Sequence, residues 1–495
     1  MSSSKSSVKH GDKTSFKPVP PFDLFYQMTY MSAMAAAGLS RSKTFEVAAQ
    51  SHSTAAEYFE AINTLVDEFR YDYPEACRRI GVQAKSENMR SFLLRFSDAL
   101  RSGEPMAEFL VREANVQSAD YENKYERNLE AMKQWTNAFT SITISVALIV
   151  IIQVISSMIY SMDSKVMTML IGTGVVIAAF GAWIIWRSAP QETMTVKASE
   201  GSAEQRRALS LIRMLGPLAF AGAAVLNLAG VPIGWILVMI AALLVPVGVI
   251  GFISDKKTTK KDEEFSTFLR SAGSMATSTG TTMKQALTVI DLSSFPTLEP
   301  DIVRLSTRLQ ALVEPEVCWK KFGVESGSKL ISEVTDIFYG GIKMGGDPER
   351  VGFLCSLFTA KTTQLRAKRR LVASTFAGLS TVMQGVIAGI MVFVLSIVFN
   401  FAEVITELMP TGEGANQGQA SMNMAMASFS PGELQFLNLI TTVMILLLAV
   451  IGATATILSD GGFRLKGALY LALTIFISGI CFLVVPSLVG GILTM

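Results

Sequence analysis

Histidine and cysteine are scarce in this chain of 495 residues, which holds two histidines and four cysteines. The cysteines are far apart and form no C-x-x-C pair, so the sequence predicts neither a disulfide framework nor a zinc or iron–sulfur site. Two histidines also leave little from which to build a histidine-based metal centre or a Ser-His-Asp triad. We therefore expect no metal and no cofactor.

Two motifs of enzymes are missing as well. No G-x-x-x-x-G-K-[ST] occurs, so the sequence has no P-loop for nucleotide phosphates. The stretch Met344-Gly345-Gly346-Asp347 resembles the G-x-G-D of membrane aspartyl peptidases, but methionine replaces the first glycine and no second intramembrane aspartate is present. A turn between helices is the better interpretation, and we expect the protein not to be an enzyme.

The N-terminus lacks the apolar stretch of a signal peptide. It is polar, basic and proline-rich as far as Pro21. We expect residues 1–21 to form a disordered cytoplasmic tail.

Long apolar runs, by contrast, are abundant. A helix that crosses a membrane needs about 20 mostly apolar residues, because the hydrocarbon core is about 30 Å thick. Seven segments meet this requirement, and the third is the shortest of them. They are approximately Ala138–Tyr160, Val166–Trp186, Met214–Gly230, Val231–Ile253, Val372–Phe401, Leu437–Leu458 and Gly467–Met495.

Lysine and arginine are distributed unequally between the segments that separate these runs. All of them except Lys165 lie in residues 1–137, 187–213, 254–371 and 459–466. The segment 402–436 contains glutamates but neither lysine nor arginine. Because positive charge is retained on the cytoplasmic side, we expect the N-terminus in the cytoplasm and the loop 402–436 outside. The sequence thus predicts a multi-pass protein of the cytoplasmic membrane.

The central parts of the seven runs contain no Asp, Glu, Lys, Arg or His. Ion-coupled transporters usually keep an ionisable residue at membrane depth, so this absence is evidence against transport. Gly378, Gly385 and Gly389 lie on one side of the fifth run, and Gly385-Val-Ile-Ala-Gly389 is a G-x-x-x-G pattern. These glycines predict close helix packing, either within the chain or in a homodimer.

The soluble segments contain an internal repeat. Residues 22–38 form a helical pattern that begins with Phe22 and ends at Gly38, and residues 265–280 repeat this plan from Phe265 to Gly280. The two terminal glycines are 242 positions apart (280 − 38). Each is suited to end a helix, because glycine adopts positive φ without a Cβ clash.

A second pair of motifs repeats at nearly the same distance. Gly103-Glu104-Pro105 corresponds to Gly346-Asp347-Pro348, at a separation of 243 (346 − 103). We expect Gly103 and Gly346 to end helices with positive φ, and Pro105 and Pro348 to lie in the first turn of the next helix. Each copy then continues through a charged helix into an apolar run.

Together these patterns predict an all-α, polytopic membrane protein with about seven transmembrane helices and two duplicated cytoplasmic helical bundles. The bundles are expected at 22–137 and 254–371. The spans are expected as pairs at 138–186 and 214–253, joined by a linker at 187–213, then one at 372–401 and two at 437–495.

Basic residues gather in several clusters of these soluble segments. Clusters beside the runs suit the anionic membrane surface and help to set topology. The alternative is docking of an acidic partner, for which the candidates are Arg78, Arg79, Lys368, Arg369 and Arg370.

The duplicated plan resembles the F-domain family of type II secretion and type IV pilus platform proteins. The resemblance is carried by Met34-Ala-Ala-Ala-Gly38-Leu39, Leu100-Arg-Ser-Gly103-Glu-Pro, Gly280 and Gly345-Gly346-Asp347-Pro348. The extra spans and the segment Phe69-Arg-Tyr-Asp-Tyr-Pro74 are closer to the archaeal branch, the platforms of the archaellum and of archaeal pili.

The resemblance implies a non-enzymatic assembly platform in the lipid bilayer. Its expected partners are a hexameric secretion ATPase, pilin-like or archaellin-like subunits and a second copy of the chain, but no nucleic acid. A transporter or channel is the first alternative, opposed by the uncharged runs. A signalling receptor is the second, opposed by the internal duplication.

Overall fold

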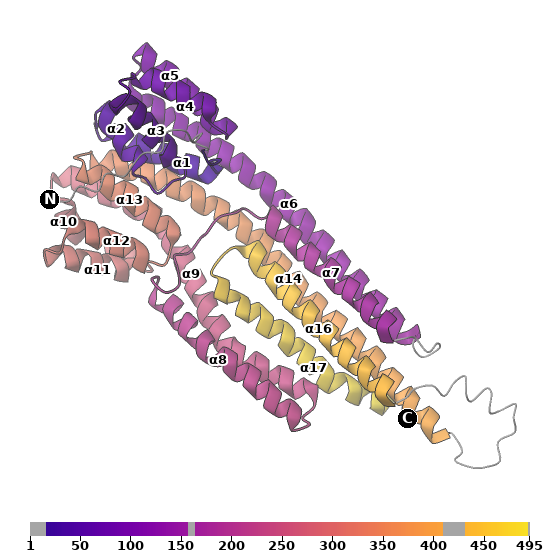
Figure 1. Cartoon of the computed structure of the whole chain (residues 1–495). Coiled ribbons are helices and arrows are strands. Elements are labelled where there is room, and N and C mark those ends of the chain that lie inside the picture. Colours follow the sequence, from indigo (N-terminus) through magenta and orange to yellow (C-terminus); the bar gives the residue numbers. More distant parts are fainter. Residues whose placement is uncertain (1–15, 157–163, 409–430, 494–495) are drawn as a thin grey trace, which may run out of the picture. The chain divides into compact units, whose positions relative to one another are not determined.

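The computed structural model describes residues 16–156, 164–408 and 431–493 (Figure 1). In these ranges every regular element is a helix, apart from one isolated antiparallel β-bridge between Thr195 and Ser328. The predicted all-α class is therefore confirmed. Residues 1–15 of the predicted tail and 409–430 of the predicted loop lie outside the described residues.

The chain divides into two compact units. We call the first the bundle unit; it comprises Met1–Lys124, Asp262–Phe322 and Ile331–Thr362. We call the second the membrane unit; it comprises Tyr125–Lys261, Gly323–Leu330 and Thr363–Met495.

Two copies of the same succession of six helices supply most of the bundle unit. The first module consists of α1 (Pro21–Ala36), α2 (Arg41–Ala49), α3 (Ala56–Asp67), α4 (Tyr73–Gln83), α5 (Glu87–Ser102) and the start of α6 (Met106–Ser156). The second consists of the end of α9 (Ile233–Thr279), α10 (Met283–Val289), the short η1 (Leu292–Ser294), α11 (Glu299–Gln310), α12 (Pro315–Glu325), α13 (Lys329–Lys343) and the start of α14 (Pro348–Leu408). From α2 and α10 onward, corresponding helices begin 242 or 243 positions apart (283 − 41, 299 − 56, 315 − 73, 329 − 87, 348 − 106).

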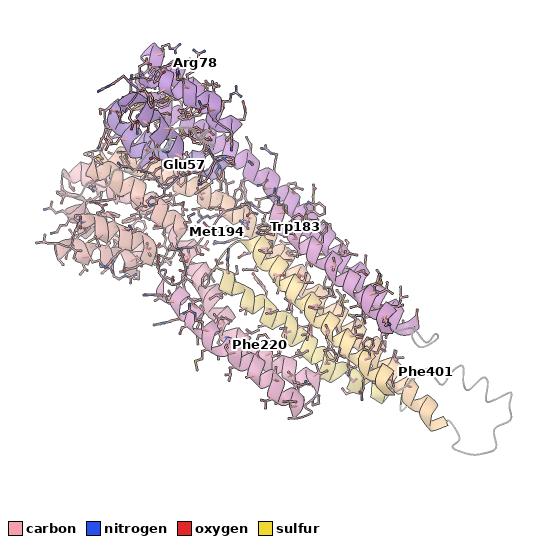
Figure 2. The ribbon with its side chains drawn as sticks, viewed as in Figure 1. Glu57, Arg78, Trp183, Met194, Phe220 and Phe401 are labelled. Atoms are coloured by element: carbon pink, nitrogen blue, oxygen red, sulfur yellow. The ribbon has the colours of Figure 1, made fainter. Side chains whose placement is uncertain are left out.

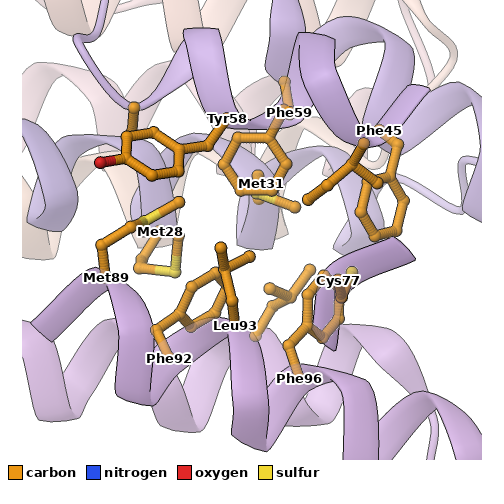
Figure 3. Packing of buried hydrophobic residues seen from close by; sticks show 14 of the residues in the cluster. Met28, Met31, Phe45, Tyr58, Phe59, Cys77, Met89, Phe92, Leu93 and Phe96 are labelled. Atoms are coloured by element: carbon orange, nitrogen blue, oxygen red, sulfur yellow. The ribbon is translucent and has the colours of Figure 1, made fainter. Parts of the chain in front are cut away.

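Stacked aromatic rings fill the core of the first module (Figure 3). The ring centroids of Phe45 and Phe96 are 5.3 Å apart, and Phe96 also stacks on Phe92 at 5.4 Å. Burial of each such side chain contributes about 1.5–3 kcal/mol. The core also takes in Phe16, whose ring lies 4.5 Å from that of Tyr58. The tail predicted for residues 1–21 therefore extends too far, because its last residues pack against the module.

The two modules contact each other within the bundle unit. Phe358 of α14 lies 4.6 Å, centroid to centroid, from Phe25 of α1. The Lys361 ammonium nitrogen is 2.5 Å from a carboxylate oxygen of Glu122 on α6. An aromatic contact and an ion pair thus join the copies.

Four further helices belong to the membrane unit, and all of them are strongly apolar. They are α7 (Ser164–Ser188), α8 (Ala203–Leu228), α16 (Pro431–Asp460) and α17 (Gly467–Leu493), with the short η2 (Arg464–Lys466) before α17. Together with α6, α9 and α14 they make seven helices in the described residues that are long and apolar enough to cross a membrane. Each predicted run has its counterpart among them, and the prediction of a polytopic membrane protein is confirmed.

The boundaries differ from the prediction, because α6, α9 and α14 pass from module to apolar run without a break. The bundle unit ends at Lys124 and Thr362 rather than at 137 and 371. Helix α14 continues to Leu408 and α16 begins at Pro431, so both ends of the predicted loop 402–436 are helical. Sequence periodicity does not show where a continuous helix leaves one environment for another.

Within the membrane unit, α6, α7, α14 and α16 share an apolar core that includes Val146, Ile171, Met391 and Met444. Helix α8 is the least buried of the seven, and Phe220 projects from it with 84% of its surface exposed (Figure 2).

Helix α9 approaches α17 and η2 closely, at one glycine each. A Cβ at Gly248 would lie 2.4 Å from the backbone nitrogen of Leu469, and one at Gly251 would lie 2.8 Å from that of Lys466. Only glycine allows this backbone contact.

Four glycines that end helices of the two modules have positive φ: Gly38 at +82°, Gly103 at +78°, Gly280 at +59° and Gly345 at +88°. The prediction for Gly346 is wrong, because its neighbour Gly345 makes the turn. Gly103 and Gly345 are then 242 positions apart (345 − 103), as Gly38 and Gly280 are.

Gly346 has a different role, since a Cβ there would lie 2.3 Å from the Cβ of Ala37 in the first module. Pro348 is the first residue of α14, as predicted for the first turn, whereas Pro105 directly precedes α6.

Candidate functional site: a buried charge network in the membrane unit

Helix α14 carries a run of basic residues, Arg366-Ala-Lys-Arg-Arg370. We call it the basic run of α14, and its side chains divide between the interior and the surface of the membrane unit. Arg366 and Arg369, three positions apart and hence on one helix face, are buried at 3% and 2% exposure. Lys368 is half-exposed, and its ammonium nitrogen lies 2.5 Å from a carboxylate oxygen of Glu126 on α6. Arg370 is partly buried. The run is therefore not one exposed basic patch.

The guanidinium of Arg369 binds three backbone carbonyls. Its Nε donates to Ser459 at 2.8 Å, Nη2 to Leu458 at 3.1 Å and Nη1 to Pro190 at 2.9 Å. Two of these carbonyls belong to the last turn of α16, where a cation satisfies groups that lack partners within the helix. The prediction that Arg369 docks a partner is therefore wrong, because its hydrogen-bonding groups are used inside the protein.

A glycine makes room for this capping arginine. Gly461 directly follows α16 and has φ of +71°. A Cβ at this position would lie 2.3 Å from the guanidinium carbon of Arg369.

Arg366 forms a buried ion pair with the linker between α7 and α8. Its Nη2 and Nε lie 2.6 and 3.0 Å from the same carboxylate oxygen of Glu192, and both side chains are at most 6% exposed. Since Arg369 binds Pro190, both arginines hold the start of this linker. The first turn of α8, which follows the linker, is held as well, because the Gln205 side-chain amide donates to the carbonyl of Gly327 at 3.1 Å.

A second buried cluster joins α9, α16 and η2. The Lys466 ammonium lies 3.0 Å from Asp255 and 2.9 Å from Asp460, and all three side chains are at most 7% exposed. The other carboxylate oxygen of Asp255 accepts the backbone N–H of Phe463 at 3.1 Å. Buried charges are costly unless paired, so each member depends on the others.

The two clusters together fasten the middle of α9, the end of α16, the start of the α7–α8 linker and the first half of α14. Their chemistry is that of fixed, charge-assisted contacts between helices. The sequence analysis missed Glu192, Asp255, Asp460 and Lys466. Their signal was visible, since each is a charged residue within a few positions of an apolar run.

The remaining candidates lie elsewhere. Arg78 (Figure 2) and its neighbour Arg79 are exposed on α4. Arg79 pairs with Glu75 at 3.0 Å and lies over the ring of Tyr71 at 4.3 Å. These two arginines remain available to a partner, because an exposed pair contributes only about 0–1 kcal/mol.

Two of the three glycines singled out in α14 lie close to side chains of α17. A Cβ at Gly385 would lie 3.0 Å from Ile477, and one at Gly389 would lie 3.9 Å from the sulfur of Cys481, both on α17. Gly378 has no such neighbour within 4 Å. Packing within the chain therefore accounts for Gly385 and Gly389.

Comparison with known proteins gives two kinds of similarity. A family model described as "Type II secretion system (T2SS), protein F" matches residues 28–154. Flagella accessory protein J of Methanocaldococcus jannaschii is 25% identical over 334 residues, which are 65% of this chain and 59% of that protein. Flagella accessory protein J of Methanococcus voltae is 21% identical over 449 residues, 88% of this chain and 79% of that protein. No solved structure matches the chain.

Proposed function

Because this chain is a relative of the type II secretion protein F family and of archaeal flagella accessory proteins J, we propose that it is the membrane platform on which an archaellum-like or pilus-like filament is assembled. In this role a cytoplasmic secretion ATPase acts on the two modules, and filament subunits with apolar helices are inserted beside the membrane unit. The protein performs no chemical reaction of its own.

One observation carries the proposal. Each module continues through a single unbroken helix, α6 or α14, into an apolar helical hairpin with α7 or α16. Helix α14 has 61 residues, which corresponds to about 90 Å at 1.5 Å per residue. No loop interrupts the path from a module to its hairpin, so a displacement of the module is passed directly to the membrane helices.

The proposal places both modules and the N-terminus in the cytoplasm. In a variant without its four native cysteines, we expect Ser421→Cys to react with an impermeant thiol reagent applied to whole cells, and Ser294→Cys to react only after the cells are opened. Ser294 is exposed in η1 of the second module, whereas Ser421 belongs to the segment with no Lys or Arg. Equal labelling of both positions in whole cells would contradict the orientation.

Deletion of the gene tests the function itself. The deletion strain should make no filament, seen by electron microscopy, while the levels of ATPase and filament subunits stay unchanged. Re-expression of the chain should restore the filament, and purified chain in nanodiscs should bind the purified ATPase. A deletion strain with normal filaments would refute the proposal and leave the transporter alternative open.

A further inference from the structure

Two non-glycine residues of the described chain have positive φ, and they occupy equivalent positions in the two modules. Arg70 and Leu312 both have φ of +59° and are 242 positions apart (312 − 70). Arg70 follows α3, and Leu312 follows the equivalent helix α11. Other positive-φ positions in the described ranges are glycines, which avoid the Cβ clash of this conformation. Both modules thus keep a large side chain where glycine would be less strained.

The turns that contain these residues expose apolar side chains. Phe69 is 60% exposed in the first module, and Leu312 is 83% exposed in the second, next to Val313 at 42%. These apolar groups add little to the core of either module. Single exposed apolar residues are common on protein surfaces, so what distinguishes these is their recurrence at equivalent turns of both modules.

A pair of adjacent basic residues follows each turn, again at equivalent positions. Arg78 and Arg79 lie on α4, and Lys320 and Lys321 lie on α12, 242 positions later (320 − 78). All four are exposed. We call each combination a turn surface: Phe69, Arg70, Arg78 and Arg79 in the first module, and Leu312, Val313, Lys320 and Lys321 in the second.

We propose that the two turn surfaces are equivalent docking sites for two copies of one acidic surface patch, presented by neighbouring subunits of a homo-oligomeric cytoplasmic protein. The inference rests on the proposed function, which supplies such a protein in the assembly ATPase. Each site receives an apolar contact at its turn and carboxylates at its basic pair. Two like sites on one chain fit a partner that repeats its own surface.

Bivalent attachment also explains how weak contacts suffice. Exposed charge pairs contribute little individually. When two weak sites bind two subunits of the same oligomer, the second contact forms at high effective concentration, and the combined affinity exceeds that of either site by about 10²–10⁴. Loss of either site should therefore weaken binding as strongly as loss of the other.

The test measures binding of the full chain, in nanodiscs of zwitterionic lipid, to the immobilised hexameric assembly ATPase from the same genome. The first variant is Phe69→Ser/Arg70→Gly/Arg78→Glu/Arg79→Glu, and the second is Leu312→Gly/Val313→Ser/Lys320→Glu/Lys321→Glu. The third combines both sets. The control, Arg41→Glu/Arg101→Glu, reverses two exposed charges elsewhere on the first module.

Each single-site variant should bind at least about tenfold more weakly than the wild type, and the combined variant should not bind. The control should stay within about twofold of the wild type. Melting temperatures should change little, because glycine relieves the strained conformation at Arg70 and Leu312 and the Arg79–Glu75 pair that is lost is an exposed one. Loss of binding with preserved stability is not expected of a merely structural role.

Four results would overturn the inference. If a variant of one turn surface binds the ATPase like the wild type, the partner does not attach at both sites. If the wild type binds anionic phosphatidylglycerol vesicles and the variants do not, the turn surfaces bind the membrane rather than a protein. A wild type that binds no ATPase would overturn the proposed function and this inference with it. Wild-type binding with unaffected variants would overturn the inference alone.

Discussion

Substitution of Arg366 by methionine is expected to destabilise the membrane unit by about 3–5 kcal/mol, because it leaves the carboxylate of Glu192 buried without its partner. The pair is short, at 2.6 Å, and both side chains are almost fully buried. The free energy of unfolding, measured by SDS titration in mixed micelles, should fall accordingly. The start of the α7–α8 linker should also become accessible to protease.

Two companion variants separate the charge effect from lost packing. Arg366→Met/Glu192→Met removes both charges and should recover most of the stability, because an apolar pair of similar size often replaces a buried ion pair without loss. Lys368→Met removes the same charge two positions along α14. Its partner Glu126 is 46% exposed, so this change should cost at most about 1 kcal/mol. Equal losses in Arg366→Met and Lys368→Met would show that the buried pair has no special role.

Substitution of Lys466 by methionine is expected to have a still larger effect, because one cation serves two buried carboxylates. Asp255 and Asp460 lie 3.0 and 2.9 Å from the ammonium nitrogen. Without it, two like charges would remain close together in a site that excludes water. We expect a loss of at least about 5 kcal/mol, or failure of the full chain to accumulate in the membrane.

A rescue variant and a control make this result specific. Lys466→Met/Asp255→Asn/Asp460→Asn is neutral, and the amide oxygen that replaces the Asp255 carboxylate can still accept the N–H of Phe463, so part of the stability should return. Lys257→Met breaks a surface pair between α9 and Glu204 of α8 and should cost at most about 1 kcal/mol. If Lys466→Met accumulates and unfolds like Lys257→Met, the cluster does not hold α9 to α16.

The membrane helices could be predicted from the sequence, because apolar length is a local property. The basic run of α14 shows where such reasoning ends. Helical spacing alone places Arg366 and Arg369 on one face, but which face is buried depends on Glu192 and Ser459, which are 174 and 90 positions away. Single-sequence reasoning cannot identify such partners, and so it assigned Arg369 to the surface.

The adjacent glycines Gly345 and Gly346 show a second limit. Both are able to make the turn, and the motif Gly-Asp-Pro favoured Gly346. Ala37 lies so close to Gly346 that no side chain fits between them, whereas Gly345 has open space around it and takes the positive φ of the turn. This contact comes from the packing of one module on the other, which the sequence does not show. The only clue in the sequence was the spacing of the repeat: Gly38 and Gly280 are 242 positions apart, and so are Gly103 and Gly345, whereas Gly103 and Gly346 are 243 apart.

The contact between the modules also constrains how many times the chain between them crosses the membrane: the number must be even. Both modules belong to one compact unit, so they lie on the same side of the membrane, and the chain between them must cross it an even number of times. Four apolar helices, α6, α7, α8 and α9, lie in that interval. Helix α8 is the least apolar and least buried of them, yet three crossings would place the second module on the wrong side. If α6, α7 and α9 cross, we expect helix α8 to cross as well, and we expect the three helices that follow the second module to carry the chain to the opposite face.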